Sequence, residues 1–444
     1  MSTSHSNYLV PVMNSHISLP KYILSLQKKG STVYTKMSYP IHCGVYSVLE
    51  TDNHIFHFNL NNEIIRAKAK GDDWGHPHEW LKRTVGNDWV FYSTGGYTGV
   101  FEATGEYYLP NFKYPTNSIL GGHPFRLQEV HSLADNWHQI LQELLDKVKF
   151  TLSSETQCNC THKKLHDFLT KVTANTPQSL EKKARQLFDI IGGRISVLPP
   201  DARHVDYNLI PLTIAQGCLY KCRFCKVKNA ALFVPKTPMD IRSQISNIKN
   251  QYGADLINCN SLFLGEHDAL LAGAELLTFS IEEAYRIFNF GNSYLDGSNV
   301  FLFGSVTSLL EAPERLFRDL ENLPPLIYIN IGLESADQET LDKIGKPISA
   351  HQVHQAFDRI QDINNRFNSI EITANFLMDE TLPKNHYPKI IQLIRDGQTF
   401  TKPKGTIYFS PLTFGTPSRA RLFEFNRLKI QSKFPTYLYI IQRL

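Results

Sequence analysis

The stretch NLIPLTIAQGCLYKCRFC, residues 208–225, joins an apolar run to three closely spaced cysteines. The first eight residues are nearly all apolar, which is typical of a strand that is buried on both faces of a sheet. Cys218, Cys222 and Cys225 then fall within eight positions, although the whole chain has only seven cysteines. Cysteine is the usual ligand of iron–sulfur clusters, so this spacing at the end of a buried strand indicates a cluster site.

Five further apolar runs follow, and helical patterns lie between most of them. The expected strands are residues 208–215, 256–264, 299–304, 326–333, 370–378 and 406–412, and the helical patterns include 239–253, 309–323 and 387–397. Apolar strands that alternate with helices predict parallel β/α units with both sheet faces covered. We therefore expect an α/β fold over residues 201–444, an incomplete (β/α)6 barrel of TIM type.

Helix boundaries between these strands are marked by capping patterns. Ser335 with Gln338 and Ser349 with Gln352 have the spacing of capping boxes, which predicts two helix starts. Gly345 predicts the end of the first of these helices.

The first half of the chain has a different pattern. Residues 34–125 are rich in aromatics, Gly and Asn, which predicts strands and hairpins with a turn at Gly95–Gly96. Two helical patterns follow at 133–150 and 179–191, the second closed by Gly192–Gly193, and residues 196–208 are interpreted as a linker. We expect a β-rich amino-terminal domain (1–127) that serves as a substrate or lid module, a helical connector (128–200) and the barrel (201–444).

The amino-acid composition argues against two classes of partner, nucleic acids and membranes. The chain has 46 basic and 42 acidic residues, and a net charge of +4 is too small to indicate a nucleic-acid partner. The first 22 residues lack a charged segment followed by an apolar core, so we expect no signal peptide. No apolar run reaches the roughly 20 residues that span a bilayer, so we expect no membrane partner. A cytoplasmic, reducing location follows, where cysteine clusters bind metals or do chemistry.

Zinc binding and redox chemistry are two other interpretations of the three cysteines. Tetrahedral zinc wants four ligands, and the nearby sequence has no paired C-x2-C or H-x3-H. A redox C-x2-C would leave Cys218 unexplained. Three thiolates on a [4Fe-4S] cube leave the fourth iron open to a ligand, and this is the interpretation we favour.

The segment GCLYKCRFC resembles the signature of the radical S-adenosylmethionine (radical SAM) enzymes, a pattern that includes the aromatic Phe224. The resemblance extends over roughly residues 205–416. SLFLGEHDALL (261–271) lies where the family carries its Gly/acid motif, and IYFSPLTFGTP (407–417) resembles the sixth-strand segment. YINIGLESADQETLDKIGKP (328–347) is similar to the subgroup of elongator-catalytic-subunit, MiaB and NifB-like proteins.

The resemblance implies a [4Fe-4S] cluster on Cys218, Cys222 and Cys225, with S-adenosylmethionine on the open iron. It also implies an oxygen-sensitive enzyme that takes electrons from a low-potential flavodoxin- or ferredoxin-like donor. Reductive cleavage of S-adenosylmethionine gives methionine and a 5′-deoxyadenosyl radical, which abstracts hydrogen from a substrate. The substrate, a small molecule or a modified biopolymer, and the residues catalysing its conversion are not indicated.

Further residues match positions where the family contacts its cofactor. Glu266 or Asp268 would accept from the ammonium group of S-adenosylmethionine, and the Asp-Ala-Leu ending favours Asp268. Glu334 and Ser335 match contacts to the ribose or carboxylate. Ser305, Asn375 and Thr413 are further candidates in this set. Three of these residues could instead have a purely structural role, because Glu266 and Ser305 lie at expected helix starts and Ser335 is an expected N-cap.

Other cysteines, histidines and aromatic residues give weaker indications of a site. Cys158, Cys160 and His162 form no complete ligand set, Cys259 is expected in the core, and we do not assign His76 and His78 to a metal. The stretch from Trp74 to Tyr97 combines aromatics with Lys82 and Arg83, a pattern that fits a planar ligand but fits hairpin core packing better. Two alternative functions remain: a non-catalytic cluster or haem carrier on the same fold, and a tRNA-modifying radical SAM enzyme.

Overall fold

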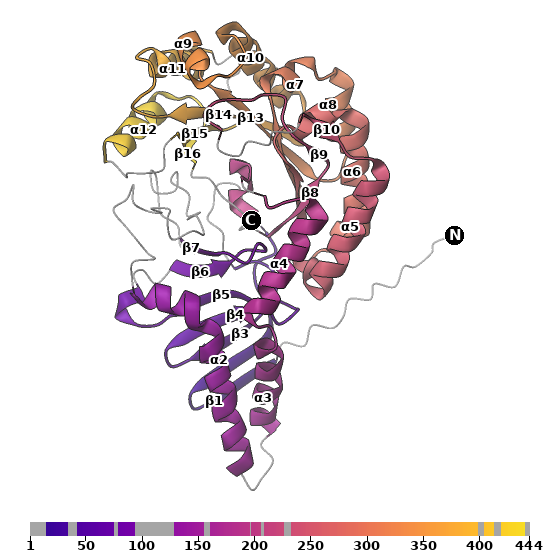
Figure 1. Ribbon diagram of the computed structural model, residues 1–444, viewed down its shortest axis with the longest axis vertical. Coiled ribbons are helices and arrows are strands. Elements are labelled where there is room, and N and C mark those ends of the chain that lie inside the picture. The colour runs from indigo at the N-terminus through magenta and orange to yellow at the C-terminus, as the bar shows by residue number, and fades with distance from the viewer. Residues whose placement is uncertain are drawn as a thin grey trace.

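The computed structural model describes ten segments of the chain (Figure 1). They are residues 15–33, 42–74, 79–93, 128–154, 160–195, 197–205, 208–225, 232–397, 404–412 and 419–439. The expected Gly95–Gly96 turn lies outside these segments. None of the helices within them is long and apolar enough to cross a lipid bilayer.

The second half of the chain forms a parallel sheet of seven strands in the order β16-β15-β14-β13-β12-β11-β8. The strands are β8 (Leu209–Thr213), β11 (Ser261–Gly265), β12 (Asn299–Gly304), β13 (Leu326–Glu334), β14 (Ile370–Met378), β15 (Ile407–Pro411) and β16 (Thr436–Leu438). The first and last strands do not pair, so the barrel is incomplete, as expected. The expectation of six strands was one short, because three residues after the last helix add β16 to β15.

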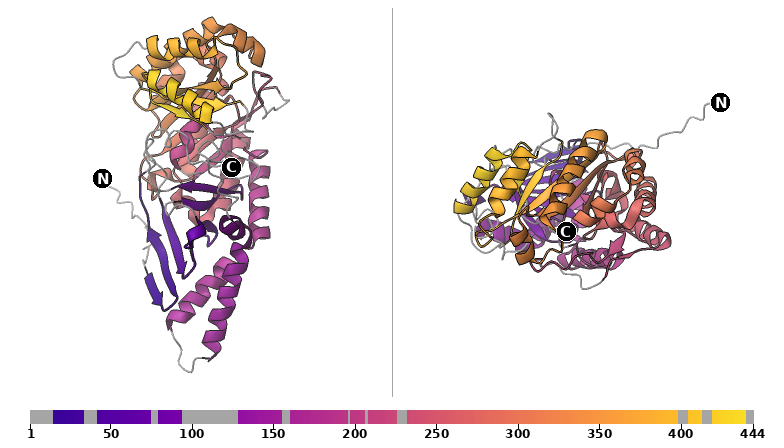
Figure 2. Two further views of the ribbon diagram at one scale, coloured as in Figure 1. Left: turned by 90° about the vertical axis from the view of Figure 1, so that its left-hand side faces the viewer. Right: turned by 90° about the horizontal axis from the view of Figure 1, so that it is seen from above.

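Helices lie outside the curved sheet (Figure 2). They are α5 (Pro238–Tyr252), α6 (Gly273–Ile287), α7 (Val306–Glu311), α8 (Glu314–Glu321), α9 (Gln338–Ile344), α10 (Ala350–Arg366), α11 (His386–Asp396) and α12 (Arg419–Gln431). Short 3-10 turns η5 (Gly253–Asn258), η6 (Ala269–Ala272) and η7 (Phe290–Asn292), and a small hairpin of β9 (Ala215–Gln216) and β10 (Val234–Pro235), complete this half. The single helical pattern expected over 309–323 is two helices, because Pro313 is the N-cap of α8 and lacks the N–H that a continuous helix needs.

The capping predictions are confirmed at two positions and wrong at one. Ser349 and Gln352 form a capping box at the start of α10, and Gly345 ends α9 in the left-handed conformation. The N-cap of α9 is Asp337, whose side chain accepts from the backbone N–H of Thr340, and not Ser335. Both residues suit an N-cap, and the buried surroundings of Ser335 engage its hydroxyl elsewhere.

The first half forms an antiparallel meander of seven strands, β1 to β7, in chain order. They are β1 (Ser15–Leu19), β2 (Tyr22–Lys29), β3 (Val45–Thr51), β4 (His54–Phe58), β5 (Ile64–Ala69), β6 (Glu79–Arg83) and β7 (Trp89–Ser93), with the turn η1 (Asp72–Trp74). Helices α2 (Gln128–Ser154) and α3 (Cys160–Thr173) share an apolar core with this sheet, and α4 (Pro177–Ile191) leads to the barrel. Cys160 is the first residue of α3.

The antiparallel sheet meets the barrel at the amino ends of the parallel strands. Asn258, just before β11, accepts from the backbone N–H of Val45 at 2.7 Å and donates to its carbonyl at 2.9 Å. Asp296, before β12, donates from its backbone N–H to the carbonyl of Thr32. The described part of the sheet therefore lies at the edge opposite the carboxyl ends of the strands (Figure 1). Strand patterns alone do not reveal which barrel edge a neighbouring sheet contacts.

Residues 197–205 are not the linker that their polar, Pro-rich sequence predicted. They contain the turn η4 (Pro200–Val205), and Asp201 within it has no exposed surface. The hydroxyls of Thr373 on β14 and Tyr408 on β15 donate to the Asp201 carboxylate at 2.7 and 2.8 Å. An incomplete barrel leaves interior space, and this segment fills part of it.

Candidate functional site

A cavity of about 520 Å³ lies at the carboxyl ends of the parallel strands. Its walls come from the loop after β8 and from the ends of β12, β13, β14 and β15. Carboxyl strand ends are where β/α folds place their active sites, because the loops that follow them meet at one rim. The lining residues are Val197, Pro200, Cys218, Tyr220, Lys221, Cys222, Phe224, Cys225, His267, Phe303, Gly304, Ser305, Asn330, Gly332, Glu334, Lys346, Asn375, Leu377, Ser410, Pro411, Leu412 and Tyr439.

All three cysteines of the motif line this cavity, and Phe224 lines it beside them. The backbone N–H of Arg223 donates to the carbonyl of Ile344 at 2.8 Å, which ties the cysteine loop to the end of α9. Burial raises the pKa of Cys222 to about 11 and also raises the pKa of Cys218. Cys218 and Cys222 would therefore have to lose their protons to bind a metal, because the thiolate is the form that ligates.

Glu334, at the end of β13, is buried and lies in an unusual backbone conformation. Its φ is 66°, the left-handed region that costs a non-glycine residue about 1 kcal/mol or more. A register shift in the β13–β14 pairing between Gly332 and Glu334 turns the side chain into the cavity. Such strain persists only where neighbouring contacts hold it, and it is concentrated at functional sites.

The Glu334 carboxylate is held by two side chains. Lys346 Nζ lies 3.6 Å from Oε1, and both side chains are less than a tenth exposed. Asn375 Nδ2 donates to Oε2 at 3.3 Å, while Ser410 Oγ donates to the Asn375 amide oxygen at 2.6 Å. Burial raises the pKa of Glu334, although Lys346 favours its charged form.

Lys346 is a buried residue that lines the cavity. Burial alone would lower the pKa of Lys346, but Glu334 and then Cys222 outweigh it and raise this pKa. The ammonium also lies 5.1 Å from the centre of the Tyr220 ring. The Tyr220 hydroxyl accepts from the backbone N–H of Thr307 at 3.0 Å and lies 2.5 Å from its hydroxyl, so the cysteine loop is tied to the start of α7.

The two acids of the GEHDAL segment have different surroundings, and neither lines the cavity. Asp268 is buried, and its Oδ1 accepts from the backbone N–H of Ser305 and the hydroxyl of Ser308, at 3.0 and 2.7 Å. Asp268 therefore secures the start of α7. Glu266 is partly exposed beside His267, which does line the cavity.

Of the remaining residues predicted to contact the cofactor, two line the cavity and one lies outside its lining. Asn375 and Ser305 line the cavity, and Ser305 is also the N-cap of α7, with Ser308 completing a capping box. Ser335 lies beneath the rim with no exposed surface, and its hydroxyl lies 2.9 Å from Nδ1 of His386. Thr413 lies outside the described residues.

Several cavity residues were not singled out from the sequence. Among them, Lys346 forms the ion pair with Glu334. Its position directly after Gly345, which ends α9, could have predicted that it lies near the cavity, because the chain leaves α9 beside the cavity wall. Tyr220, His267, Asn330 and Ser410 gave no such signal, since each is a single polar residue in an ordinary context.

The minor candidates lie away from this cavity. Cys259 is buried at the opposite edge, as expected of a core residue, and Cys160 is exposed on α3. Trp80 and Lys82 are buried in the antiparallel sheet, which agrees with core packing. The remaining residues of this kind, Cys158, His76, His78 and Tyr97, lie outside the described segments.

The donor set of the cavity fits an iron–sulfur cluster. Three thiols share one wall, and thiolate is the ligand that such clusters prefer. Within the described segments no three Cys, His, Asp or Glu side chains are grouped closely enough for one metal ion. A cubane gives each cysteine its own iron, so its ligands stand further apart than the ligands of a single ion.

Comparison with known proteins agrees with this geometry. Residues 212–391 match the profile of the Radical SAM superfamily. This part of the chain is a radical SAM domain. The enzymes of this superfamily use a [4Fe-4S] cluster and S-adenosylmethionine, and the radical SAM domain spans β8 to α11, with all three cysteines inside it.

No curated protein matches the chain significantly. Among solved structures, the cobalamin-dependent S-adenosylmethionine radical enzyme OxsB with aqua-cobalamin is 13% identical over 52% of this chain and 32% of its own, with a TM-score of 0.35. Streptococcus suis SuiB bound to precursor peptide SuiA is 11% identical over 70% and 62%, with a TM-score of 0.34. A radical SAM methyltransferase from Sphaerobacter thermophilus is 13% identical over 51% and 64%, with a TM-score of 0.33. The chain thus spans less than two thirds of each, and these scores carry no argument about its substrate.

Proposed function

We propose that this protein is a radical SAM enzyme that binds a [4Fe-4S] cluster through Cys218, Cys222 and Cys225 and S-adenosylmethionine in the 520 Å³ cavity. When bound, the cluster and S-adenosylmethionine supply reductive cleavage to methionine and a 5′-deoxyadenosyl radical, which abstracts hydrogen from a substrate. The observation that carries the proposal is the convergence of three thiols and a buried carboxylate–ammonium pair on one cavity.

The buried pair suits the methionine end of the cofactor. That end carries one ammonium and one carboxylate, and Glu334 and Lys346 offer one partner for each. Asn375 and Ser410 keep the Glu334 carboxylate oriented before any ligand arrives, so little ordering is needed on binding.

The apolar residues of the cavity wall are proposed to keep water out of the site. Phe303, Leu377 and Leu412 line the cavity together with the ring of Tyr439. Apolar side chains exclude water, which protects a reactive radical from side reactions. The substrate is proposed to enter the same cavity, and a low-potential flavodoxin- or ferredoxin-like protein is the proposed electron donor.

The test is anaerobic reconstitution of the full chain with iron and sulfide, followed by reduction and measurement of 5′-deoxyadenosine. We expect iron binding, charge-transfer absorbance and 5′-deoxyadenosine release in the wild type, and loss of release in Cys222→Ala. Cys160→Ala is the matched control, because Cys160 is an exposed thiol on α3.

The outcomes separate the alternatives. A reconstituted cluster without any release of 5′-deoxyadenosine would favour a carrier protein. Purified protein that binds zinc at the three cysteines instead of iron would contradict the proposal. Deuterium transfer into 5′-deoxyadenosine from a deuterated cell extract would then identify extracts that contain the substrate.

A further inference from the structure

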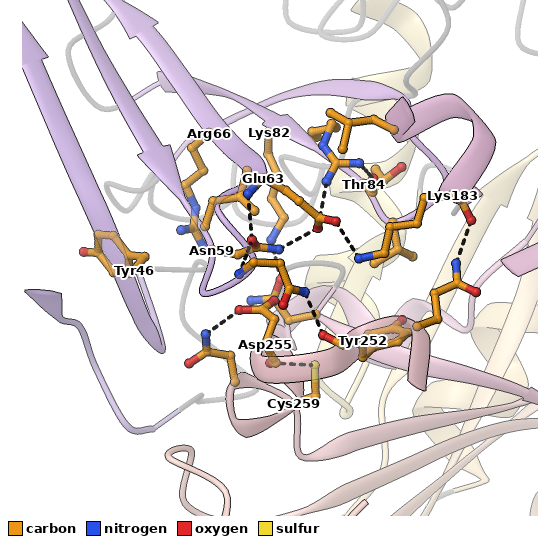
Figure 3. Close-up of a pocket in the computed structure, with 18 of the residues that line it drawn as sticks. Tyr46, Asn59, Glu63, Arg66, Lys82, Thr84, Lys183, Tyr252, Asp255 and Cys259 are labelled. Carbon is orange, nitrogen blue, oxygen red and sulfur yellow. Dashed lines mark hydrogen bonds and ion pairs between the residues drawn. The ribbon is translucent and has the colours of Figure 1, made fainter. Parts of the chain in front are cut away.

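A small cavity of about 90 Å³ lies where the antiparallel sheet meets the barrel, and several of its polar side chains pair with one another (Figure 3). Lys183 Nζ lies 2.5 Å from Oε1 of Glu63, and the backbone N–H of Leu60 donates to Oδ1 of Asp255 at 3.2 Å. These contacts join the two halves of the chain. The larger cysteine cavity contains, at Asn330, an amide that protein groups engage from one side.

Asn330 lies on β13 inside the barrel, at the inner part of the cysteine cavity. Asn330, Gly332 and Glu334 all line the cavity, since alternate residues of a strand face the same side. Asn330 is two residues, or roughly 7 Å, further from the carboxyl end of the strand than Gly332. It is only 2% exposed. The Glu334 carboxylate thus lies nearer the rim and the Asn330 amide deeper in the barrel.

A chain of hydrogen bonds fixes the orientation of the Asn330 amide. The Asp201 carboxylate accepts from the hydroxyl of Thr373 at 2.7 Å and from that of Tyr408 at 2.8 Å. A carboxylate only accepts, so the single hydrogen of the Thr373 hydroxyl points to Asp201. The Thr373 oxygen is therefore an acceptor for Asn330, whose Nδ2 donates to it at 2.9 Å. The amide oxygen of Asn330 consequently faces away from Thr373.

This amide oxygen is an acceptor on the cavity side of Asn330. Among the described residues, the bond to Thr373 is the one hydrogen bond of the Asn330 side chain. Asn330 lines the cavity and has almost no exposed surface elsewhere, so the space that its oxygen reaches is the space of the cavity. A buried polar group is costly unless it is hydrogen-bonded, so this oxygen favours a ligand that carries a donor.

Gly332 keeps the path from the rim to Asn330 open. A Cβ at Gly332 would clash with the carboxylate of Glu334 and would lie 3.6 Å from Lys346 Nζ, so it would occupy space inside the cavity. Phe303 is the register partner of Asn330 on β12, and it also lines the cavity. A ligand that reaches this depth therefore meets an aromatic side chain and one hydrogen-bond acceptor.

We propose that Asn330 accepts a hydrogen bond from an N–H or O–H group of the substrate, and that Thr373 and Asp201 are its positioning residues. The substrate class that fits is a largely apolar molecule with such a donor. This inference rests on the proposed function, which assigns the charged end of S-adenosylmethionine to the rim and leaves the deeper acceptor to the substrate. A site built around an acceptor rejects analogues without the donor, because the acceptor then stays unsatisfied.

The test uses indole and benzofuran as probes, because these two bicyclic molecules have nearly the same shape. Indole carries an N–H that only donates, and benzofuran has an oxygen in its place that only accepts. We expect the full-length protein to bind indole about tenfold more tightly than benzofuran in equilibrium titrations, with and without S-adenosylmethionine. Equal affinities would overturn the proposal. Displacement of indole by S-adenosylmethionine would assign the acceptor to the cofactor and would overturn it as well.

Asn330→Leu is the decisive variant, because leucine has a similar shape and no acceptor. The ratio of the two affinities should fall to about one in this variant, since the hydrogen bond to indole is lost. Asn365→Leu makes the same substitution at an exposed position on α10 and should keep the preference for indole. A preference that persists in Asn330→Leu would show that indole binds elsewhere, and the proposal would fail.

The positioning residues predict a second pattern. Thr373→Val removes the acceptor for Asn330 Nδ2, and the new amide of Asp201→Asn can donate to Thr373, so in both variants the Asn330 amide is free to rotate. The preference for indole should shrink in both variants and return in Thr373→Ser, which keeps the hydroxyl. A merely structural role would weaken the binding of both probes equally, and an unchanged ratio would therefore contradict the positioning roles.

The radical SAM proposal and the Asn330 proposal can fail separately. Cys222→Ala should lose the release of 5′-deoxyadenosine and keep the preference for indole, because Cys222 belongs to the loop after β8 and Asn330 to β13. A wild type that releases 5′-deoxyadenosine and binds both probes equally would retain the radical SAM function and refute the role of Asn330.

Discussion

Lys346 Nζ lies 3.6 Å from Glu334 Oε1 in a position where both side chains are almost fully enclosed. The two residues are twelve positions apart, on the end of β13 and directly after the turn that closes α9. Removal of one partner would leave the other as a buried, uncompensated charge, which typically costs about 3–5 kcal/mol.

This ion pair predicts a strong coupling in a double-mutant cycle. Lys346→Met and Glu334→Gln should each lower the free energy of unfolding by a few kcal/mol, and the double variant should lose less than the sum. Urea unfolding of the four proteins measures this. Additive losses would show that the two side chains are not coupled.

Substitution of Ser335 tests whether its hydroxyl supports the fold or contacts the cofactor. Its hydroxyl accepts from the backbone N–H of Asp337 at 3.0 Å and lies 2.9 Å from His386 Nδ1, so Ser335→Ala leaves buried polar groups unsatisfied. We expect a loss of about 1–3 kcal/mol in the free energy of unfolding, with the affinity for S-adenosylmethionine unchanged. Equilibrium binding to the reconstituted protein checks the second half, and a weakened affinity at unchanged stability would assign Ser335 to the cofactor.

Two substitutions of Asp268, one that keeps its acceptor oxygen and one that removes it, should differ in their effect on stability. Asp268→Asn keeps an oxygen that accepts from Ser305 and Ser308, whereas Asp268→Ala removes it. The alanine variant should therefore lose about 1–3 kcal/mol of unfolding free energy and the asparagine variant clearly less. Chemical denaturation compares the two, and equal losses would contradict the role of Asp268 as an acceptor for α7.

Asp255 predicts a pH dependence of stability. Burial raises the pKa of Asp255 to about 6, from 3.8, so between these values the folded protein holds a proton that the unfolded chain has released. The contribution of Asp255 to stability therefore becomes less favourable as the pH rises from 4 to 7, by at most about 3 kcal/mol.

The measurement is urea unfolding of wild type and Asp255→Asn in buffers between pH 4 and pH 7. The stability of the wild type relative to the variant should fall across this interval. Asp72→Asn, which removes a carboxylate from an exposed position in η1, is the matched control. A constant difference for Asp255→Asn would place its folded pKa at the ordinary value.

Much of the barrel was predictable because its signals are local. Six of the seven parallel strands are apolar runs, and the ends of α9 and α10 follow from Gly345 and Ser349. The cysteine spacing predicted a shared site, and all three thiols line one cavity. Each of these features depends on neighbours within a few positions, which the sequence displays directly.

Other features depended on contacts between distant residues. The short strand β16 has only three residues, and residues 198–202 are buried because they pack against β14 and β15 inside the open barrel. The antiparallel sheet lies at the amino edge of the barrel through Asn258 and Asp296, which are ordinary loop residues in the sequence.

The amino-acid sequence by itself determined the β/α alternation, the helix ends and the ligand trio, because propensity, capping and spacing act over short stretches of chain. Only the tertiary structure decided that Lys346 neutralises Glu334, that Asp268 holds α7 and that Asn258 joins the antiparallel sheet to the barrel. Burial and charge pairing are properties of the surroundings, and those surroundings include residues more than two hundred positions away in the sequence.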